Sequence, residues 1–224
     1  MQTAYQPTTQ FSAFPPVVKN LLIVNGLLAL WMLVQPVDAL LTHWFGLWRV
    51  GNPVGLLLPN GTQTNTFWPW QIVTYGFLHG GPVHLLFNML SLWMFGAAIE
   101  NVWGSKRFGV YYAICLVGAG VAQLVVYAIQ GTPVPTVGAS GAVLGILLAF
   151  GMMYPDQMIY VYLFPVKAKY LVLFYAAMDL FGGFSGSSSN VAHFAHLGGM
   201  LVGFVVILYW RGRLPLKPRE RLSW

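Results

Sequence analysis

The stretch "TPVPTVGASGAVLGILLAF", residues 132–150, leads from a short polar segment into a long apolar run. Two prolines and Thr136 precede the run, and Ser140 stands near its start. With Thr136 as the N-cap, Ser140 is expected about four residues into a helix. The run is apolar enough to lie in a membrane, where a polar side chain is costly and therefore a functional candidate. Ser140 thus either allows close helix packing or acts as a nucleophile where water is scarce.

The composition of the whole chain is that of a membrane protein. Of its 224 residues, 57% are hydrophobic and only 7% are charged, whereas a soluble domain has about 25% charged residues. The formal charge of +6 is scattered between apolar blocks, with no basic stripe beside stacking aromatics. The lipid bilayer is therefore the expected partner, and nucleic acid is not. The single cysteine, Cys115, excludes an intrachain disulfide and leaves the redox compartment open.

Six apolar segments approach the length of about 20 residues that a membrane helix needs. They predict an all-α protein in which residues 1–19 form a cytoplasmic N-terminal segment and residues 20–211 form the membrane domain. Residues 212–224 form a basic cytoplasmic tail, and residues 157–166 are expected to be an interfacial loop. The predicted spans are 20–42, 82–103, 108–129, 136–154, 168–185 and 191–211.

The placement of basic residues supports this count. With both termini in the cytoplasm, ten of the eleven Lys and Arg residues fall on the cytoplasmic side, as the positive-inside rule requires. The exception is Arg49, in the segment 43–81, which is rich in tryptophan and is predicted to be an outer loop lying in the membrane interface. The ten are Lys19, Lys106, Arg107, Lys167, Lys169, Arg211, Arg213, Lys217, Arg219 and Arg221.

Ser140 lies at the outer end of its span, which is also the N-terminus of that helix. Unpaired backbone N–H groups and the positive end of the helix dipole lie there, and both can stabilise an oxyanion. The structural alternative is that Gly138, Gly141 and Gly145, which have small-xxx-small spacing, serve only to pack helices closely.

The last span, "NVAHFAHLGGMLVGFVVIL", offers a base for such a serine. His196, Gly199 and Gly203 lie at positions i, i+3 and i+7, on one helix face. If span four docks on this glycine groove, Ser140 meets His196 at a similar depth, which is the minimum for an activated nucleophile. A histidine that merely hydrogen-bonds between helices is the alternative.

Span two adds a third polar cluster at the outer side. His84 and Asn88 lie four residues apart on one face, and both can donate hydrogen bonds to an oxyanion, although they could also simply join helices. The convergence of three clusters in the outer third of spans two, four and six favours chemistry over packing. Of the acidic residues, Glu100 is expected to be a structural partner of basic groups, and Asp38 and Asp179 to reach interfacial water.

Four motifs in this order resemble the rhomboid family of intramembrane serine proteases, over roughly residues 70–204. "GASGA" is similar to its G-x-S-G motif, "AHLGGMLVG" to A-H-x-x-G-x-x-x-G, "HLLFNM" to H-x-x-x-N, and "ENVWG" to E-x-x-x-G. The resemblance implies a minimal six-transmembrane-helix bundle with both termini cytoplasmic. One departure is Trp70-Gln71, where many members carry Trp-Arg, and it bears on how the first outer loop is anchored.

The resemblance also implies roles. Ser140 attacks the scissile carbonyl, His196 is the general base and then acid, and His84, Asn88 and the Ser140 backbone N–H form the oxyanion hole. The family pattern is a dyad without a carboxylate, and no Asp or Glu lies near His196 on its own helix. No metal or cofactor is expected.

The main functional hypothesis is therefore hydrolysis of peptide bonds in or near transmembrane helices, with single-pass proteins as substrates and a bacterial cytoplasmic membrane as location. A catalytically silent rhomboid-like protein that binds membrane clients is the first alternative. A metal transporter using His79, His84, His193 and His196 is the second, since four histidines could bind zinc. Against it, no acidic residue is expected among them, and H-E-x-x-H is absent.

Overall fold

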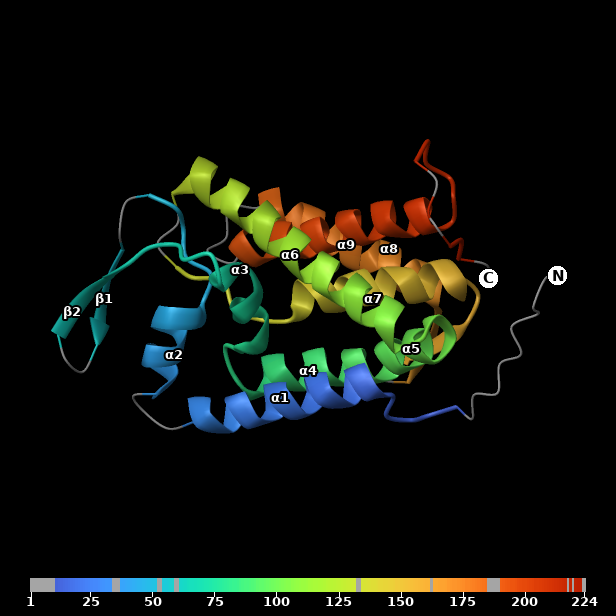
Figure 1. The fold of residues 1–224 in the computed structure, drawn as a ribbon, viewed down its shortest axis with the longest axis horizontal. Helices are drawn as coiled ribbons and strands as arrows, with labels where there is room; N and C mark the ends of the chain where they lie inside the picture. Colours follow the sequence, from blue (N-terminus) through green and yellow to red (C-terminus); the bar gives the residue numbers. More distant parts are fainter. Residues whose placement is uncertain are drawn as a thin grey trace.

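A computed structural model describes residues 11–33, 37–51, 54–58, 61–131, 134–161, 163–184, 190–216, 218 and 220–222. The predicted cytoplasmic segments thus lie partly outside the described residues. Helices dominate the fold, and the antiparallel hairpin β1–β2 projects at one end (Figure 1). A second antiparallel hairpin, β3–β4, lies between α7 and α8 in the chain. The elements are α1 (Pro16–Met32), α2 (Val37–Phe45), β1 (Val54–Leu58), β2 (Gly61–Asn65), α3 (Gln71–Thr74), the 3₁₀ turn η1 (Tyr75–Phe77), α4 (Pro82–Ser91), the π-helical turn η2 (Leu92–Gly96), α5 (Ala97–Trp103), α6 (Ser105–Gln130), α7 (Ser140–Met153), β3 (Met158–Val161), β4 (Phe164–Lys167), α8 (Ala168–Phe184) and α9 (Asn190–Trp210).

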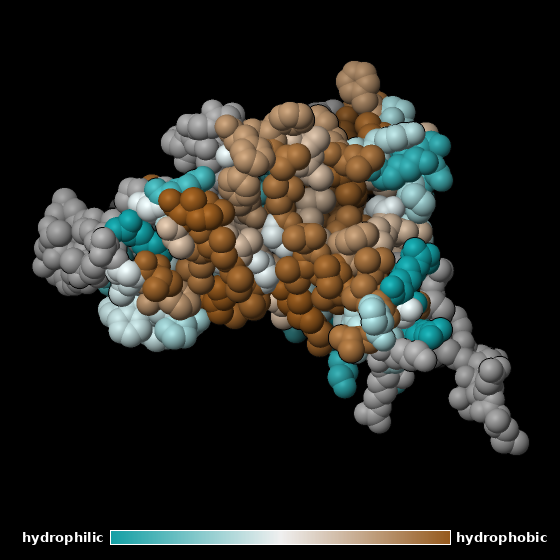
Figure 2. Space-filling view, turned by 90° about the horizontal axis from the view of Figure 1, so that it is seen from above, coloured by the Kyte–Doolittle hydropathy of each residue, from teal (hydrophilic) through white to brown (hydrophobic). Residues whose placement is uncertain are grey.

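Within the described residues, three helices are long and apolar enough to cross a membrane: Pro82–Trp103, which joins α4, η2 and α5, then Ser105–Gln130 and His193–Trp210. Two shorter apolar helices, α1 and α7, accompany them. Figure 2 shows apolar side chains covering the middle of the visible face, with hydrophilic ones gathered toward its ends. Such a distribution is typical of a protein whose middle is surrounded by lipid and whose two ends are in water.

Helix α9 lies against α6, α7 and α8, and this packing positions the polar side chains Ser140, His193 and His196. The α7–α9 contact depends on glycine: a Cβ on Gly199 would overlap the backbone carbonyl oxygen of Gly141. Helix α7 also contacts α6, where the Tyr111 hydroxyl donates a hydrogen bond of 2.7 Å to the Gly145 carbonyl of α7. Small residues let membrane helices approach closely enough for van der Waals and interhelical hydrogen-bond contacts.

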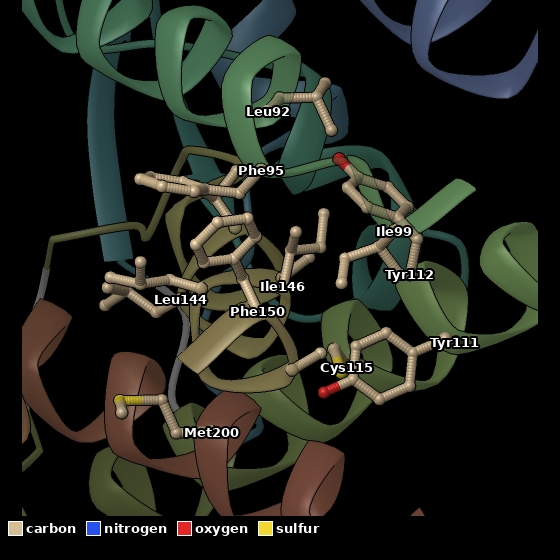
Figure 3. Packing of buried hydrophobic residues seen from close by; sticks show 14 of the residues in the cluster. Leu92, Phe95, Ile99, Tyr111, Tyr112, Cys115, Leu144, Ile146, Phe150 and Met200 are labelled. Atoms are coloured by element: carbon tan, nitrogen blue, oxygen red, sulfur yellow. The ribbon is translucent and has the colours of Figure 1, made fainter. Parts of the chain in front are cut away.

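Below this contact, one apolar cluster joins the helices (Figure 3). Phe95 from η2 packs on Phe150 from α7 with 5.0 Å between ring centroids, and Cys115 of α6 lies buried near Tyr111. Because the cluster takes side chains from η2, α5, α6, α7 and α9, among other elements, it fixes the depth of α7 relative to α6 and α9.

Three predicted boundaries are wrong. The predicted span 20–42 is two helices, because α1 ends at Met32 and α2 begins at Val37. Residues 157–166 are not a loop, because Met158–Val161 and Phe164–Lys167 pair as an antiparallel hairpin.

The third correction concerns the helix of Ser140. It does not start near Thr136 but at Ser140 itself. Thr136 is held in extended backbone by a β-bridge to Leu47, with both N–H···O distances at 3.0 Å. Thr136 therefore cannot serve as the N-cap.

Glu100 has a different partner from the basic groups that were expected. Its carboxylate is 2% exposed and accepts hydrogen bonds from the backbone N–H groups of Val17 (2.9 Å) and Val18 (2.8 Å). The Ser105 hydroxyl donates a third, at 2.6 Å. The negative charge thus caps the N-terminus of α1, where free N–H groups and the helix dipole favour an anion.

Gln71, at the position where the family pattern often has Arg, anchors the segment between α2 and α3 with its amide. It is fully buried, and its Oε1 accepts from the backbone N–H groups of Trp48 (3.3 Å) and Trp68 (3.1 Å). Its Nε2 donates to the Trp44 carbonyl at 3.4 Å. A neutral side chain with both a donor and acceptors therefore ties three points of the loop together.

Candidate active site

Ser140 is the first residue of α7, and the turn before it is built around Gly138. The Gly138 N–H donates to the Tyr75 carbonyl at 2.9 Å, and Gly138 has a φ of +125°, which residues other than glycine rarely adopt. A Cβ there would also lie 2.6 Å from Cε1 of His84. Since Ser140 is in the first turn, its backbone N–H has no intrahelical acceptor and lies at the positive end of the helix.

The structure brings Ser140 and His196 together. Nε2 of His196, on α9, lies 2.7 Å from Oγ of Ser140, which is a short hydrogen bond. The close approach of Gly141 and Gly199 is what permits it, because these glycines lie one residue and three residues beyond the two polar side chains. A serine hydroxyl hydrogen-bonded to an imidazole nitrogen can be deprotonated during attack on a carbonyl.

His84 and Asn88 lie on α4, next to this turn. The Gly80 N–H donates to Nδ1 of His84 at 3.3 Å, so the neutral ring carries its proton on Nε2. That nitrogen faces the turn before Ser140, since it would be 2.9 Å from a Cβ on Gly138. Asn88 is buried and uses one amide hydrogen on the His84 carbonyl, at 2.9 Å, which leaves its second hydrogen for another acceptor.

Asp179, on α8, is the residue that the sequence assigned to the wrong environment. It is 5% exposed rather than open to interfacial water. Its Oδ1 lies 3.0 Å from Nδ1 of His196 and 2.7 Å from Nδ1 of His193. The expectation of no carboxylate near His196 is correct along α9 only, because the neighbouring helix supplies one. The available signal was an ionisable residue inside a span, which usually pairs with another polar group.

Among the residues that the structure describes, the same three side chains form a group that could hold a metal. Asp179, His193 and His196 each offer one ligand atom, all within 4.8 Å of one another. Tetrahedral zinc with bonds of about 2.0 Å would separate its ligand atoms by about 3.3 Å, and the observed 2.7 and 3.0 Å fit hydrogen bonds better.

One argument against the transporter hypothesis was that no acidic residue lies among the four histidines, and this is wrong, because Asp179 contacts both His193 and His196. The hypothesis also needs the four histidines to share one site. In the described part of the chain, no group of three metal-ligating side chains includes His79 or His84. Their two rings instead contact each other edge to face, with 5.2 Å between centroids.

Comparison with known proteins agrees with the motifs. The family model described as "Rhomboid domain" matches residues 67–213. The chain is 32% identical to Rhomboid protease GluP of Bacillus subtilis over 137 residues, and this aligned region covers 60% of this chain and 25% of that protein. It is 30% identical over 190 residues to the rhomboid protein YdcA of the same organism, covering 82% and 86%.

A mitochondrial relative is similar at the same level. Rhomboid protein 1 of Saccharomyces cerevisiae is 30% identical over 157 residues, which cover 67% of this chain and 44% of that protein. The chain thus spans a quarter of the length of GluP and less than half of the yeast protein. With a domain match over most of its length and a relative of similar size, this chain belongs to the rhomboid family of integral membrane proteins.

Proposed function

We propose that this protein is an intramembrane serine endopeptidase that uses Ser140 as nucleophile and His196 as general base. The observation that carries the proposal is the 2.7 Å contact between Ser140 Oγ and His196 Nε2 at the N-terminus of an apolar helix. Relatives named as rhomboid proteases support the reaction class.

The geometry suits acyl transfer in two halves. His196 Nε2 takes the Ser140 proton as Oγ attacks the scissile carbonyl carbon, which gives a tetrahedral intermediate with a negative oxygen. The protonated His196 then donates to the leaving amine, and an acyl-enzyme remains. A water molecule, deprotonated by the same nitrogen, attacks the ester and releases the second product.

The oxyanion would be stabilised by three donors. These are the Ser140 backbone N–H, Nε2–H of His84 and the free amide hydrogen of Asn88. Donors that are fixed before the reaction stabilise the developing charge without having to reorganise, and removal of one such donor typically costs about 10²–10³ in kcat.

The proposed setting is a bundle of six spans with both termini in the cytoplasm, which places Ser140 below the outer membrane surface. Transmembrane proteins with a single span are the proposed substrates. Because helical carbonyls are already hydrogen-bonded, the substrate must unwind locally, so segments with Gly or helix-breaking residues near the outer face are favoured. A bacterial cytoplasmic membrane is the proposed location, although the relatives include mitochondrial proteins.

The test is cleavage of a labelled single-pass substrate by the pure protein in liposomes containing EDTA. Wild type should cleave and Ser140→Ala should not, and a fluorophosphonate probe should label Ser140 in the wild type only. Substrate binding without cleavage or labelling would instead indicate a catalytically silent client-binding protein. Cleavage that persists in Ser140→Ala would refute the proposed nucleophile.

A further inference from the structure

We propose that Asp179 is a positioning residue that holds His196 in the tautomer and orientation needed for a general base. The inference rests on the proposed function, and it extends the serine–histidine pair to three residues on α7, α9 and α8. Its basis is that both ring nitrogens of His196 are engaged, Nε2 by Ser140 at 2.7 Å and Nδ1 by Asp179 at 3.0 Å.

The carboxylate decides which nitrogen of His196 carries the proton. An ionised carboxylate can only accept hydrogen bonds, so Nδ1 must be the protonated nitrogen in the neutral ring. Nε2 is then left with its lone pair directed at the Ser140 hydroxyl, and this is the form that can remove a proton. Without the carboxylate the tautomer with Nε2–H would also be populated, and that tautomer donates to Ser140 and cannot act as a base.

The charge of Asp179 also matches the change that His196 undergoes. When His196 takes the serine proton it becomes a cation, inside a membrane domain with little water to solvate it. A carboxylate that is 5% exposed and 3.0 Å from the ring stabilises that cation directly. The same arrangement orients and stabilises the histidine in soluble serine proteases.

His193 keeps the carboxylate in place. Its Nδ1 lies 2.7 Å from the same Oδ1, so two imidazole groups converge on one oxygen. The His193 ring lies directly against α8 at Gly182, where a Cβ would be 2.5 Å from its Nε2. Asp179 Oδ2 is buried and has no hydrogen-bond partner among the described side chains and backbone. The orientation of Asp179 is therefore set by the two histidines, and His193 is the group that restrains it independently of catalysis.

Two variants remove the carboxylate in different ways. Asp179→Asn keeps almost the same volume but replaces the charge by an amide, which can donate to Nδ1 and favour the wrong tautomer, whereas Asp179→Leu removes all hydrogen bonding. The corresponding change of Asp to Asn in a soluble serine protease lowers kcat by about 10⁴. We therefore expect kcat to fall by about 10²-fold or more in both variants, with KM within about twofold of wild type.

The matched control is Asp156→Asn, which removes a carboxylate that is exposed and bonded only to Lys167 and Lys169 in the described residues. It should leave both kinetic constants unchanged. Unfolding temperature is measured for every variant. If Asp179→Leu does not fold, the nearly isosteric Asp179→Asn decides, by the same kinetics and by the spectroscopic measurement that follows.

The tautomer is read directly by nitrogen NMR of ¹⁵N-histidine-labelled protein in liposomes, on the inactive Ser140→Ala background, with His196 assigned by the loss of its signals in His196→Asn. We expect a protonated Nδ1 and an unprotonated Nε2 when Asp179 is present. A larger share of the tautomer with Nε2–H is expected once Asp179→Leu or Asp179→Asn is added. A merely structural role for Asp179 would not move this signal.

The outcomes are distinguishable. If wild type and Ser140→Ala have equal activity, the proposed function is wrong, and Asp179 then has no catalytic histidine to position. If cleavage depends on Ser140 but the folded Asp179 variants keep the wild-type kcat, the inference alone is overturned. An unchanged His196 tautomer in those variants would overturn it as well.

Discussion

Gly199→Ala should separate α7 from α9 and disable the site without touching a polar group. The added Cβ would overlap the Gly141 carbonyl oxygen and lie 2.7 Å from its carbonyl carbon. These are backbone atoms of a helix, so they cannot rotate away as the end of a side chain could. Since a carbon–oxygen contact normally needs about 3.3 Å or more, the two helices must move apart by about 1 Å.

This displacement acts on the contact between Ser140 and His196. A distance of 2.7 Å that grows by about 1 Å exceeds the limit of a useful hydrogen bond. Misplacement of reacting groups by that amount costs about 10²-fold in rate, and overpacking a tight core costs about 1–3 kcal/mol of stability. We therefore expect kcat/KM to fall by about 10²-fold while the protein still folds.

The assay compares kcat/KM for a single-pass substrate in liposomes, fluorophosphonate labelling and thermal unfolding. Gly26→Ala, within α1, is the matched control because a Cβ there has nothing within 4 Å. It should raise stability by about 0.5–1 kcal/mol, since alanine favours helix over glycine, and leave activity unchanged. Wild-type kcat/KM in Gly199→Ala would refute the argument that backbone contact between these helices sets the site geometry.

Three further predictions concern the supports of the fold. Glu100→Gln replaces one carboxylate oxygen with a donor facing the α1 N-terminus, so the free energy of unfolding should fall by about 1–3 kcal/mol in denaturant titration, whereas an unchanged midpoint would show that water replaces the cap. Gln71→Met removes three hydrogen bonds to the segment between α2 and α3 and should cost about 1–3 kcal/mol, with faster proteolysis between residues 43 and 70 as its readout. Burial, with a smaller contribution from His84, lowers the pKa of His79 from 6.5 to about 4. The unfolded chain therefore binds the proton first, so stability should fall by about 3 kcal/mol as pH drops from about 6.5 to 4. His79→Gln should flatten that decline, and an unaltered pH profile would contradict the assignment.

Local pattern in the sequence was enough to identify the kind of molecule. Composition and apolar length indicate a membrane protein, because the cost of burying charge in lipid acts on every segment separately. The spacing of His196, Gly199 and Gly203 places a histidine above a small-residue face, and four ordered motifs carry the family resemblance. Each of these signals lies within one helix, where a period of 3.6 residues fixes which side chains share a face.

Only the tertiary structure decided the contacts between distant segments. The β-bridge between Leu47 and Thr136 keeps Thr136 out of α7, so this helix begins at Ser140. Glu100, which is far from α1 in the sequence, caps that helix, and Asp179 contacts His196 from another helix. A hydrogen bond between segments depends on the relative depth and rotation of two helices, and a few ångströms in either can make or break it. Hydrophobic periodicity specifies neither quantity, so the partner of a buried polar group is known only when the helices are packed.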